Sequence, residues 1–266
     1  MNKVLKYKIL HTLEDKKFIV LVLAYILMFN YEIIISSGVL TLGDEAFNAL
    51  MKHDLLMNNF IIISLSFGLF VSIYLGMSII GKDIEINQMY ILLTNIHSRK
   101  QYIFISWFSM VIIMIGIHII ININLLCVEL ALGIKLNFAE LLLANKEIIL
   151  NILVLLSITA FFVIALEGYI GGIGGIFALI IYNIHTYENI PLFNIQVMNL
   201  PEPVKRIMFN LVPLKAVQLP STIENGNAYL LDIPLPYIIN NIELYQVVFV
   251  IIAVLLMIYV FEKKDL

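Results

Sequence analysis

Two glycines and a lysine have the spacing of a phosphate-binding loop. Gly76 is followed by four residues and then by Gly81 and Lys82, as in the loop that holds nucleotide phosphates in ATPases. The Ser or Thr that this loop needs next is replaced by Asp83, whose carboxylate would face the phosphates. Such a loop also follows a strand, whereas a long apolar run precedes Gly76. The stretch therefore favours a membrane helix that ends at Gly81 over an ATP site.

Other residues that could perform catalysis lie too far apart. Ser78 and His118 could serve as nucleophile and base of a membrane protease, but they lie about 5 Å and roughly 24 Å along their helices from the same side of the membrane. The five histidines are scattered, no His-Glu-x-x-His motif is present, and the single cysteine, Cys127, excludes a thiolate cluster. We therefore expect no catalytic residue, no cofactor and no metal in this chain, and no enzymatic activity.

The composition predicts an all-α integral membrane protein. Of the 266 residues, 61% are hydrophobic and 13% are charged, and the mean hydropathy is +0.98. Soluble domains carry about a quarter charged residues. The net charge of −3 gives no indication of nucleic-acid binding.

Apolar segments of about 20 residues predict membrane-spanning helices. We predict one permease-like domain over residues 1–266, in which the fourth and fifth spans form a tight hairpin. The six expected spans are 18–37, 60–80, 102–126, 148–166, 168–184 and 244–261.

Basic residues predict the orientation of the spans. With a cytoplasmic N-terminus, ten of the 16 Lys and Arg residues fall in the short cytoplasmic segments. The excess of positive charge on the cytoplasmic side of membrane proteins then places both termini in the cytoplasm. We expect a multi-pass protein of a bacterial cell membrane.

The segments outside the spans differ in character. In residues 3–17, Leu5, Ile9 and Leu13 share one helical face with lysines elsewhere, which favours an interfacial amphipathic helix over a simple charged tail. Residues 185–243 contain all seven prolines and are expected outside the cell. We expect short amphipathic or re-entrant helices there, before the last span.

Two groups of residues inside the expected spans have alternative interpretations. His118 and Asn122 lie on one face of the third span, with Asn124 nearby, and form either a translocation surface or an interhelical hydrogen bond. Glycines at the start of the fifth span have the spacing that allows close helix packing, with a moving gate as the alternative. The glycines concerned are Gly168, Gly171, Gly172 and Gly175.

The loop between the second and third spans has its own pattern of capping residues. Asp83 is a candidate N-cap, and Glu85 suits the positive first turn of a short helix. Ser98 and Gln101 have the spacing of a capping box for the third span. A helix end, a short helix and a capped restart would form a rigid element between two spans.

This loop resembles that of the type-2 ABC exporter permeases. Their acidic pair corresponds to Asp83 and Glu85, their central segment to Leu92-Leu93-Thr94, and the end of the motif to Ser98-Arg99. The order of the spans and external segment resembles the same family over the whole chain. The sequence departs from the motif at Asn87, Gln88, Ile96 and His97, and lacks the later lysine.

The resemblance implies a permease subunit that exports a substrate when a separate nucleotide-binding ATPase subunit hydrolyses ATP. ATP and Mg²⁺ would bind that partner, and a second copy or a paralogue would complete the transporter in the lipid membrane. It also suggests peptide or antibiotic export. The residues implied in coupling to the ATPase are Asp83, Glu85, Met89, Leu92, Ser98 and Arg99.

A self-sufficient channel or secondary carrier is the alternative. Carriers usually contain paired repeats or ionisable residues near the middle of the membrane. Here Glu32 and Glu167 fall near the ends of spans, and only His118 is deep. An ATPase encoded by a neighbouring gene would distinguish the two hypotheses.

Overall fold

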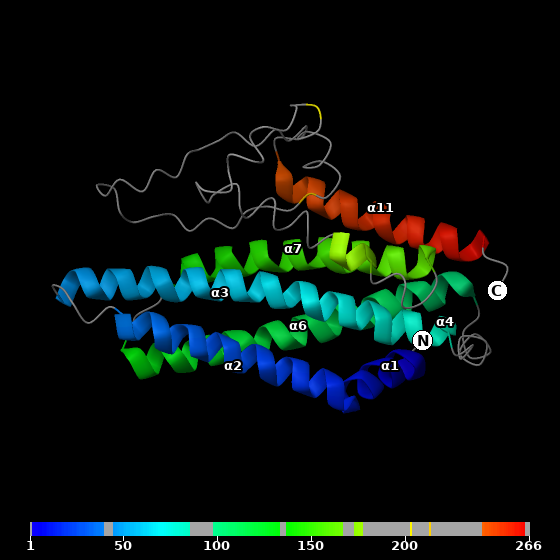
Figure 1. Cartoon of the computed structure of the whole chain (residues 1–266). Coiled ribbons are helices and arrows are strands. Elements are labelled where there is room, and N and C mark those ends of the chain that lie inside the picture. The colour runs from blue at the N-terminus through cyan, green and yellow to red at the C-terminus, as the bar shows by residue number, and fades with distance from the viewer. Residues whose placement is uncertain are drawn as a thin grey trace.

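The computed structural model describes residues 2–39, 45–85, 98–133, 137–166, 173–177, 203, 213 and 241–263. Within these residues the secondary structure is helical and contains no strand. The long helices lie side by side, and the two chain ends lie at the same end of the bundle (Figure 1). The elements are α1 (Asn2–Glu14), α2 (Lys16–Val39), α3 (Glu45–Leu75), η1 (Gly76–Gly81), α4 (Lys82–Glu85), α6 (Arg99–Leu132), α7 (Phe138–Ala165) and α11 (Ile242–Lys263).

Four helical segments of the described residues are long and apolar enough to cross a membrane. They are Asn59–Ile84, Arg99–Ala131, Phe138–Ala165 and Ile242–Lys263. These segments confirm the helical membrane character and contain the expected spans 60–80, 102–126 and 244–261, and all but the last residue of 148–166.

Two further expected spans are less fully described. Helix α2 covers the expected first span, 18–37, whereas only residues 173–177 of the fifth are described, as a helical segment. Six spans therefore stay a prediction. Of the external segment 185–243, the structure describes residues 203, 213 and 241–243 alone.

Polar residues define where two of the long helices begin. The Ser98 side chain accepts a hydrogen bond from the Gln101 backbone N–H at 3.2 Å, so Ser98 is the N-cap of α6, as its spacing predicts. Asn137 caps α7 by accepting from the Ala139 N–H. Helix α6 ends at Leu132 and is capped by Gly133, whose φ of 64° is the left-handed conformation that glycine adopts without strain.

Helix α7 is at the centre of the bundle and α11 is at its edge. In the most apolar window of each helix, 67% of α7 is buried and 17% of α11. The outer face of α11 carries exposed Leu, Ile, Val and Tyr side chains. Lipid chains are as apolar as leucine, so such a face is stable in a bilayer, and helices associate there through packing and hydrogen bonds.

Small residues allow helices to approach α3 and α7 closely. A methyl group added at Gly68 would lie 2.9 Å from the Ile152 side chain, and one added at Gly76 would lie 3.0 Å from Thr159. Gly175, one of the expected packing glycines, lies against Ile73. Gly168, Gly171 and Gly172 lie outside the described residues.

The stretch with phosphate-loop spacing is helical. Residues Gly76–Gly81 form one π-helical segment that continues α3, and α4 extends the same rod to Glu85. The expectation that the helix ends at Gly81 is therefore wrong. The helix continues because Lys82 has α-helical dihedrals, with φ −61° and ψ −42°. With a helix in place of the strand and loop, this stretch cannot wrap a phosphate.

Candidate functional site at the loop-bearing end

Four elements meet at the end of the bundle from which the first cytoplasmic loop is expected to emerge. They are α1, the η1–α4 segment, the start of α6 and the end of α11, and they lie near both chain termini (Figure 1). Residues 86–97 of the loop lie outside the described residues, but both ends of the loop are described. The side chains that hold these ends in place form the candidate site.

A buried ion pair is the centre of this site. The Lys8 Nζ lies 2.5 Å from Asp83 Oδ2 and donates a second hydrogen bond, of 2.9 Å, to the backbone carbonyl of Ile79. The two charged side chains are only 3% and 10% exposed. The ammonium therefore contacts both the π-helical segment and the carboxylate that follows it.

Tyr102 connects this ion pair to α6 and α11. Its hydroxyl donates to Asp83 Oδ2 at 2.8 Å, and its ring centroid lies 4.7 Å from the Lys8 Nζ. The same ring stacks on Phe261 of α11 at 5.6 Å. We call Lys8, Asp83, Tyr102 and Phe261 the anchor cluster.

The sequence of α1 places Lys8 in this position. Val4, Lys8 and Thr12 recur every four residues, so they share one helical face, and all three are buried. The Thr12 hydroxyl donates to the Lys8 carbonyl at 2.8 Å and so is itself satisfied. Thus α1 packs on the bundle through a face that contains a lysine.

Burial of the ammonium has a large electrostatic cost, which its partners offset. Burial lowers the pKa of Lys8 below its ordinary value, while attraction to the Asp83 carboxylate and the hydrogen bond from Lys8 to it oppose that shift. A buried ion pair is tolerated when its remaining hydrogen-bonding groups are satisfied. Here the Ile79 carbonyl accepts from Lys8, and the Tyr102 hydroxyl donates to Asp83. Removal of either charged partner would leave the other buried and unpaired.

One expectation about these residues is wrong, and another is confirmed only in part. Asp83 is not an N-cap, because it lies within a continuous helix and its carboxylate contacts Lys8 and Tyr102. The predicted apolar face of α1 is not its only buried face, because Lys8, which lies off that face, points inward. Leu5 and Ile9 do pack against the core, whereas Leu13 is 47% exposed.

Contacts at the rim hold the same elements together. Lys82 Nζ lies 3.3 Å from His11 Nε2, and Lys100 pairs with Glu262 at 3.4 Å. Such exposed contacts contribute little to stability by themselves. They do join the same four elements as the anchor cluster, because the first contact links α4 to α1 and the second links α6 to α11.

The elbow between α1 and α2 is tied to α3 by one side chain. The Tyr74 hydroxyl donates to Asp15 Oδ2 at 2.6 Å, and the Lys17 backbone N–H donates to Asp15 Oδ1 at 2.9 Å. The hydrogen bond from Tyr74, followed by that from Lys17, lowers the pKa of the Asp15 carboxyl below its ordinary value. The carboxylate form is therefore the one that holds the elbow.

The other residues implied in coupling are only partly described. Glu85 is the last residue of α4, and Arg99, the first of α6, makes at least one interaction. Met89 and Leu92 lie outside the described residues. The structure thus brings Asp83 next to Tyr102, one turn after the Ser98 cap.

A second polar group lies further along the bundle, between α6 and α7. Asn122 and Asn145 exchange two side-chain hydrogen bonds of 2.9 Å, and His118 Nε2 contacts Asn145 Oδ1. Asn122 also donates to the His118 carbonyl at 2.8 Å. Of the two interpretations of His118 and Asn122, this geometry favours the interhelical hydrogen bond. We call His118, Asn122 and Asn145 the amide cluster.

Two more polar pairs cross between helices. Asn30 and Asn124 exchange hydrogen bonds of 3.1 and 3.4 Å. The Gln246 amide donates to Asn151 at 2.8 Å and to the Pro213 carbonyl at 2.9 Å. The sequence does not single out Asn30, Asn151 and Gln246, because each is an isolated amide in a largely apolar run. Asn145 was missed because α7 begins ten residues before the expected span.

The described residues do not bring together a catalytic or metal site. The Ser78 hydroxyl contacts the Leu75 carbonyl, whereas His118 contacts Asn145 of the amide cluster. Within the described residues no group of three His, Cys, Asp or Glu side chains could hold a metal ion.

Comparisons of the chain with family models, curated proteins and solved structures give no match.

Proposed function

We propose that this chain is the membrane-spanning permease subunit of an ATP-driven exporter. The observation that supports the proposal best is the anchor cluster. Through it, Asp83 at the root of the first loop contacts α1 and α6 directly, and Tyr102 of α6 connects it to α11. A displacement of the loop would therefore displace three helices besides its own.

The physical reason for this coupling is the cost of separating the cluster. If the loop moved alone, Asp83 would leave the ammonium of Lys8 buried without a counter-charge. If the connected helices move together, the contacts within the anchor cluster are all kept. A partner that pulls on the loop thus acts on α1, α6 and α11.

The proposed function requires a separate ATPase subunit, which binds ATP and Mg²⁺ and docks on residues 86–97. A second copy or a paralogue of this chain would complete the pathway for an amphipathic peptide or antibiotic. Both chain ends lie at the end of the bundle that carries Lys82, Lys100 and Lys263 (Figure 1). The excess of positive charge in cytoplasmic segments makes this end the proposed cytoplasmic one, in a bacterial cell membrane.

The polar pairs within the bundle favour a second candidate function, a channel or secondary carrier. The amide cluster and the Asn30–Asn124 pair place donors and acceptors between apolar helices. Polar groups in such positions often line the pathway of a carried substrate. A carrier would transport without an ATPase.

Affinity purification of the tagged chain from its native membrane tests the proposal. We expect an ATPase subunit with a phosphate-binding loop to co-purify. Glu85→Ala and Met89→Asp, in and after α4, should lower its yield or abolish ATP-dependent export while membrane insertion stays normal. Lys146→Ala is the matched control, because the exposed Lys146–Glu243 pair joins α7 and α11 outside the anchor cluster.

The outcomes separate the candidate functions. Loss of the ATPase in the loop variants alone would support the exporter. Transport by the purified chain without any ATPase would overturn the exporter and support the carrier. Normal ATP-dependent export by both loop variants would show that the loop is a simple connector.

A further inference from the structure

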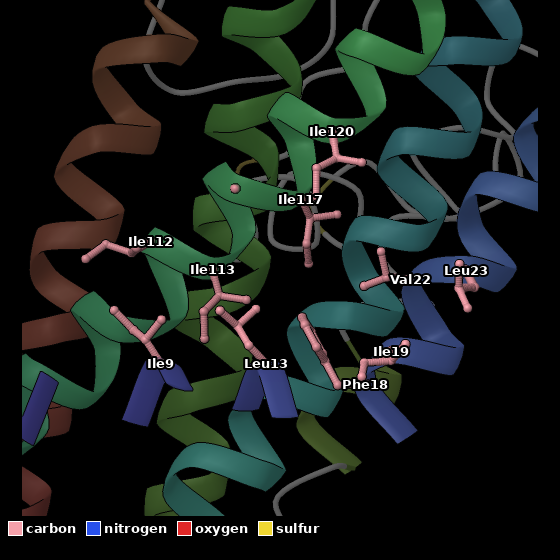
Figure 2. A pocket seen from close by; sticks show the side chains of 11 residues that line it. Ile9, Leu13, Phe18, Ile19, Val22, Leu23, Ile112, Ile113, Ile117 and Ile120 are labelled. Atoms are coloured by element: carbon pink, nitrogen blue, oxygen red, sulfur yellow. The ribbon is translucent and has the colours of Figure 1, made fainter. Parts of the chain in front are cut away.

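An apolar groove lies beside the elbow between α1 and α2. It has a volume of about 450 Å³ and is bounded by side chains of α1, α2 and α6. Figure 2 shows these side chains gathered around one space, with Ile9 and Leu13 on α1, Ile19 and Leu23 on α2, and Ile117 on α6. The volume is in the range of small-molecule sites, roughly 300–1,000 Å³.

Every residue that lines the groove is apolar. Isoleucine, leucine, valine and phenylalanine side chains form the walls, and Gly116 of α6 leaves the space open. A methyl group added at Gly116 would meet no atom within 4 Å. Water gains no hydrogen bonds in such a site, so an apolar chain is the favoured occupant.

The elbow beside the groove carries two carboxylates followed by two lysines, Glu14 and Asp15 and then Lys16 and Lys17. Lys16 lies one turn before Ile19 and two turns before Leu23, so helical spacing places it on the groove face of α2, and Lys17 follows it. Both are exposed. The neighbouring Asp15 carboxylate accepts hydrogen bonds from Tyr74 and from the Lys17 backbone.

We propose that this groove binds an anionic phospholipid. One acyl chain lies between α1, α2 and α6, and the headgroup phosphate lies against Lys16 and Lys17. The groove adjoins helices long and apolar enough to span a bilayer, so lipid is the apolar molecule that surrounds it. Lysines on flexible stems beside an apolar surface match the chemistry of an anionic headgroup above its chains.

Lipid titration of the purified full-length chain, followed by native mass spectrometry, tests this inference. Dioleoyl phosphatidylglycerol and dioleoyl phosphatidylcholine are the two probes. We expect the chain to retain one phosphatidylglycerol about tenfold more tightly than phosphatidylcholine, since two lysines contact the charged headgroup.

Two variants separate the contribution of the groove from that of the charges. Gly116→Leu fills the groove from an open position and should weaken retention of both lipids about tenfold. Lys16→Gln with Lys17→Gln should abolish the preference for phosphatidylglycerol while retaining the chain-dependent binding.

Two control variants make the same kinds of change, loss of two lysines and enlargement of a side chain, outside the groove and its entrance. Lys3→Gln with Lys6→Gln removes the same charge from α1, away from the elbow. Leu130→Phe enlarges a side chain of α6 that is 82% exposed and outside the groove. Both should bind lipid as the unchanged protein does.

Other outcomes would overturn the inference. Equal retention of the two lipids by the unchanged chain would exclude an anionic headgroup site. Unchanged lipid retention in Gly116→Leu would show that lipid does not occupy the groove. If that variant instead altered the oligomeric state, the occupant would be a second copy of this chain. The titration contains no ATPase, so its result is independent of the proposed exporter function.

Discussion

The anchor cluster and the amide cluster join helices by different kinds of interaction. The first contains two opposite charges, both almost fully buried, with partners on four elements. The second joins α6 to α7 through an imidazole and two neutral amides. A neutral group left unpaired costs much less than a buried charge left unpaired. The loop-bearing end should therefore separate less easily than the amide cluster.

Removal of one charge from the anchor cluster should have the largest effect. Asp83→Leu leaves Lys8 buried without a counter-charge, so the free energy of unfolding should fall by about 3–5 kcal/mol. Unfolding in mixed micelles by titration with dodecyl sulfate measures this change. Lys6→Met, at an exposed position of α1, is the control, and its free energy of unfolding should stay within about 0.5 kcal/mol of that of the unchanged protein.

The double variant Lys8→Met with Asp83→Leu sharpens this result. It removes both charges and should recover most of the lost stability, although the Tyr102 hydroxyl then loses its acceptor at a cost of about 1 kcal/mol. A double variant as unstable as Asp83→Leu alone would mean that the charge pairing does not stabilise this end.

Loss of the shared partner in the amide cluster should have an intermediate effect. Asn145→Leu removes the partner of both His118 and Asn122 and should lower the free energy of unfolding by about 1–2 kcal/mol. The same titration measures it, with Leu142→Ala at an exposed position of α7 as control. A cycle with Asn122→Leu should give a coupling of about 0.6 kcal/mol. A loss as large as that of Asp83→Leu would contradict the proposed difference between the clusters.

The Asn30–Asn124 pair should contribute less to the free energy of unfolding than the amide cluster does. Its two hydrogen bonds, of 3.1 and 3.4 Å, are longer than the two bonds of 2.9 Å between Asn122 and Asn145. Asn30→Leu should lower the free energy of unfolding by about 0.5 kcal/mol or less. An effect above that of Asn145→Leu would reverse the order expected from the geometry.

The pH dependence at the elbow should be the smallest effect. Because the folded state lowers the pKa of Asp15 below its ordinary value of 3.8, its stabilisation is fully present above pH 3.8 and is lost as the pH falls through the lowered pKa. Tyr74→Phe keeps the ring that stacks on Phe18 but removes the hydroxyl. Its melting temperature should lie slightly below that of the unchanged protein at pH 7, and the difference should shrink as the pH falls below 3.8 and disappear below the lowered pKa. A constant difference across this range would exclude Asp15 as the cause.

Apolar run lengths and caps were enough to predict most of the helical framework. The expected spans 60–80, 102–126 and 244–261 fall within described helices, and Ser98 caps α6 as its spacing predicts. These features depend on residues close together in sequence, because helices form through local hydrogen bonds and the bilayer sets their length. The continuity of the helix across Gly81 was not predicted because a glycine is as compatible with a π-helical segment as with a helix end.

The inward position of Lys8 was decided by the tertiary structure. In α1 the series Val4, Lys8, Thr12 and the series Leu5, Ile9, Leu13 have the same spacing, and hydropathy alone favours the second as the buried face. The first series is buried because Asp83, 75 residues further along the chain, supplies a counter-charge. Asn145 likewise becomes part of a site only because α7 places it against Asn122. Sequence patterns fix which residues can form a helix, whereas the burial of a charge or an amide depends on a partner that only the packed helices supply.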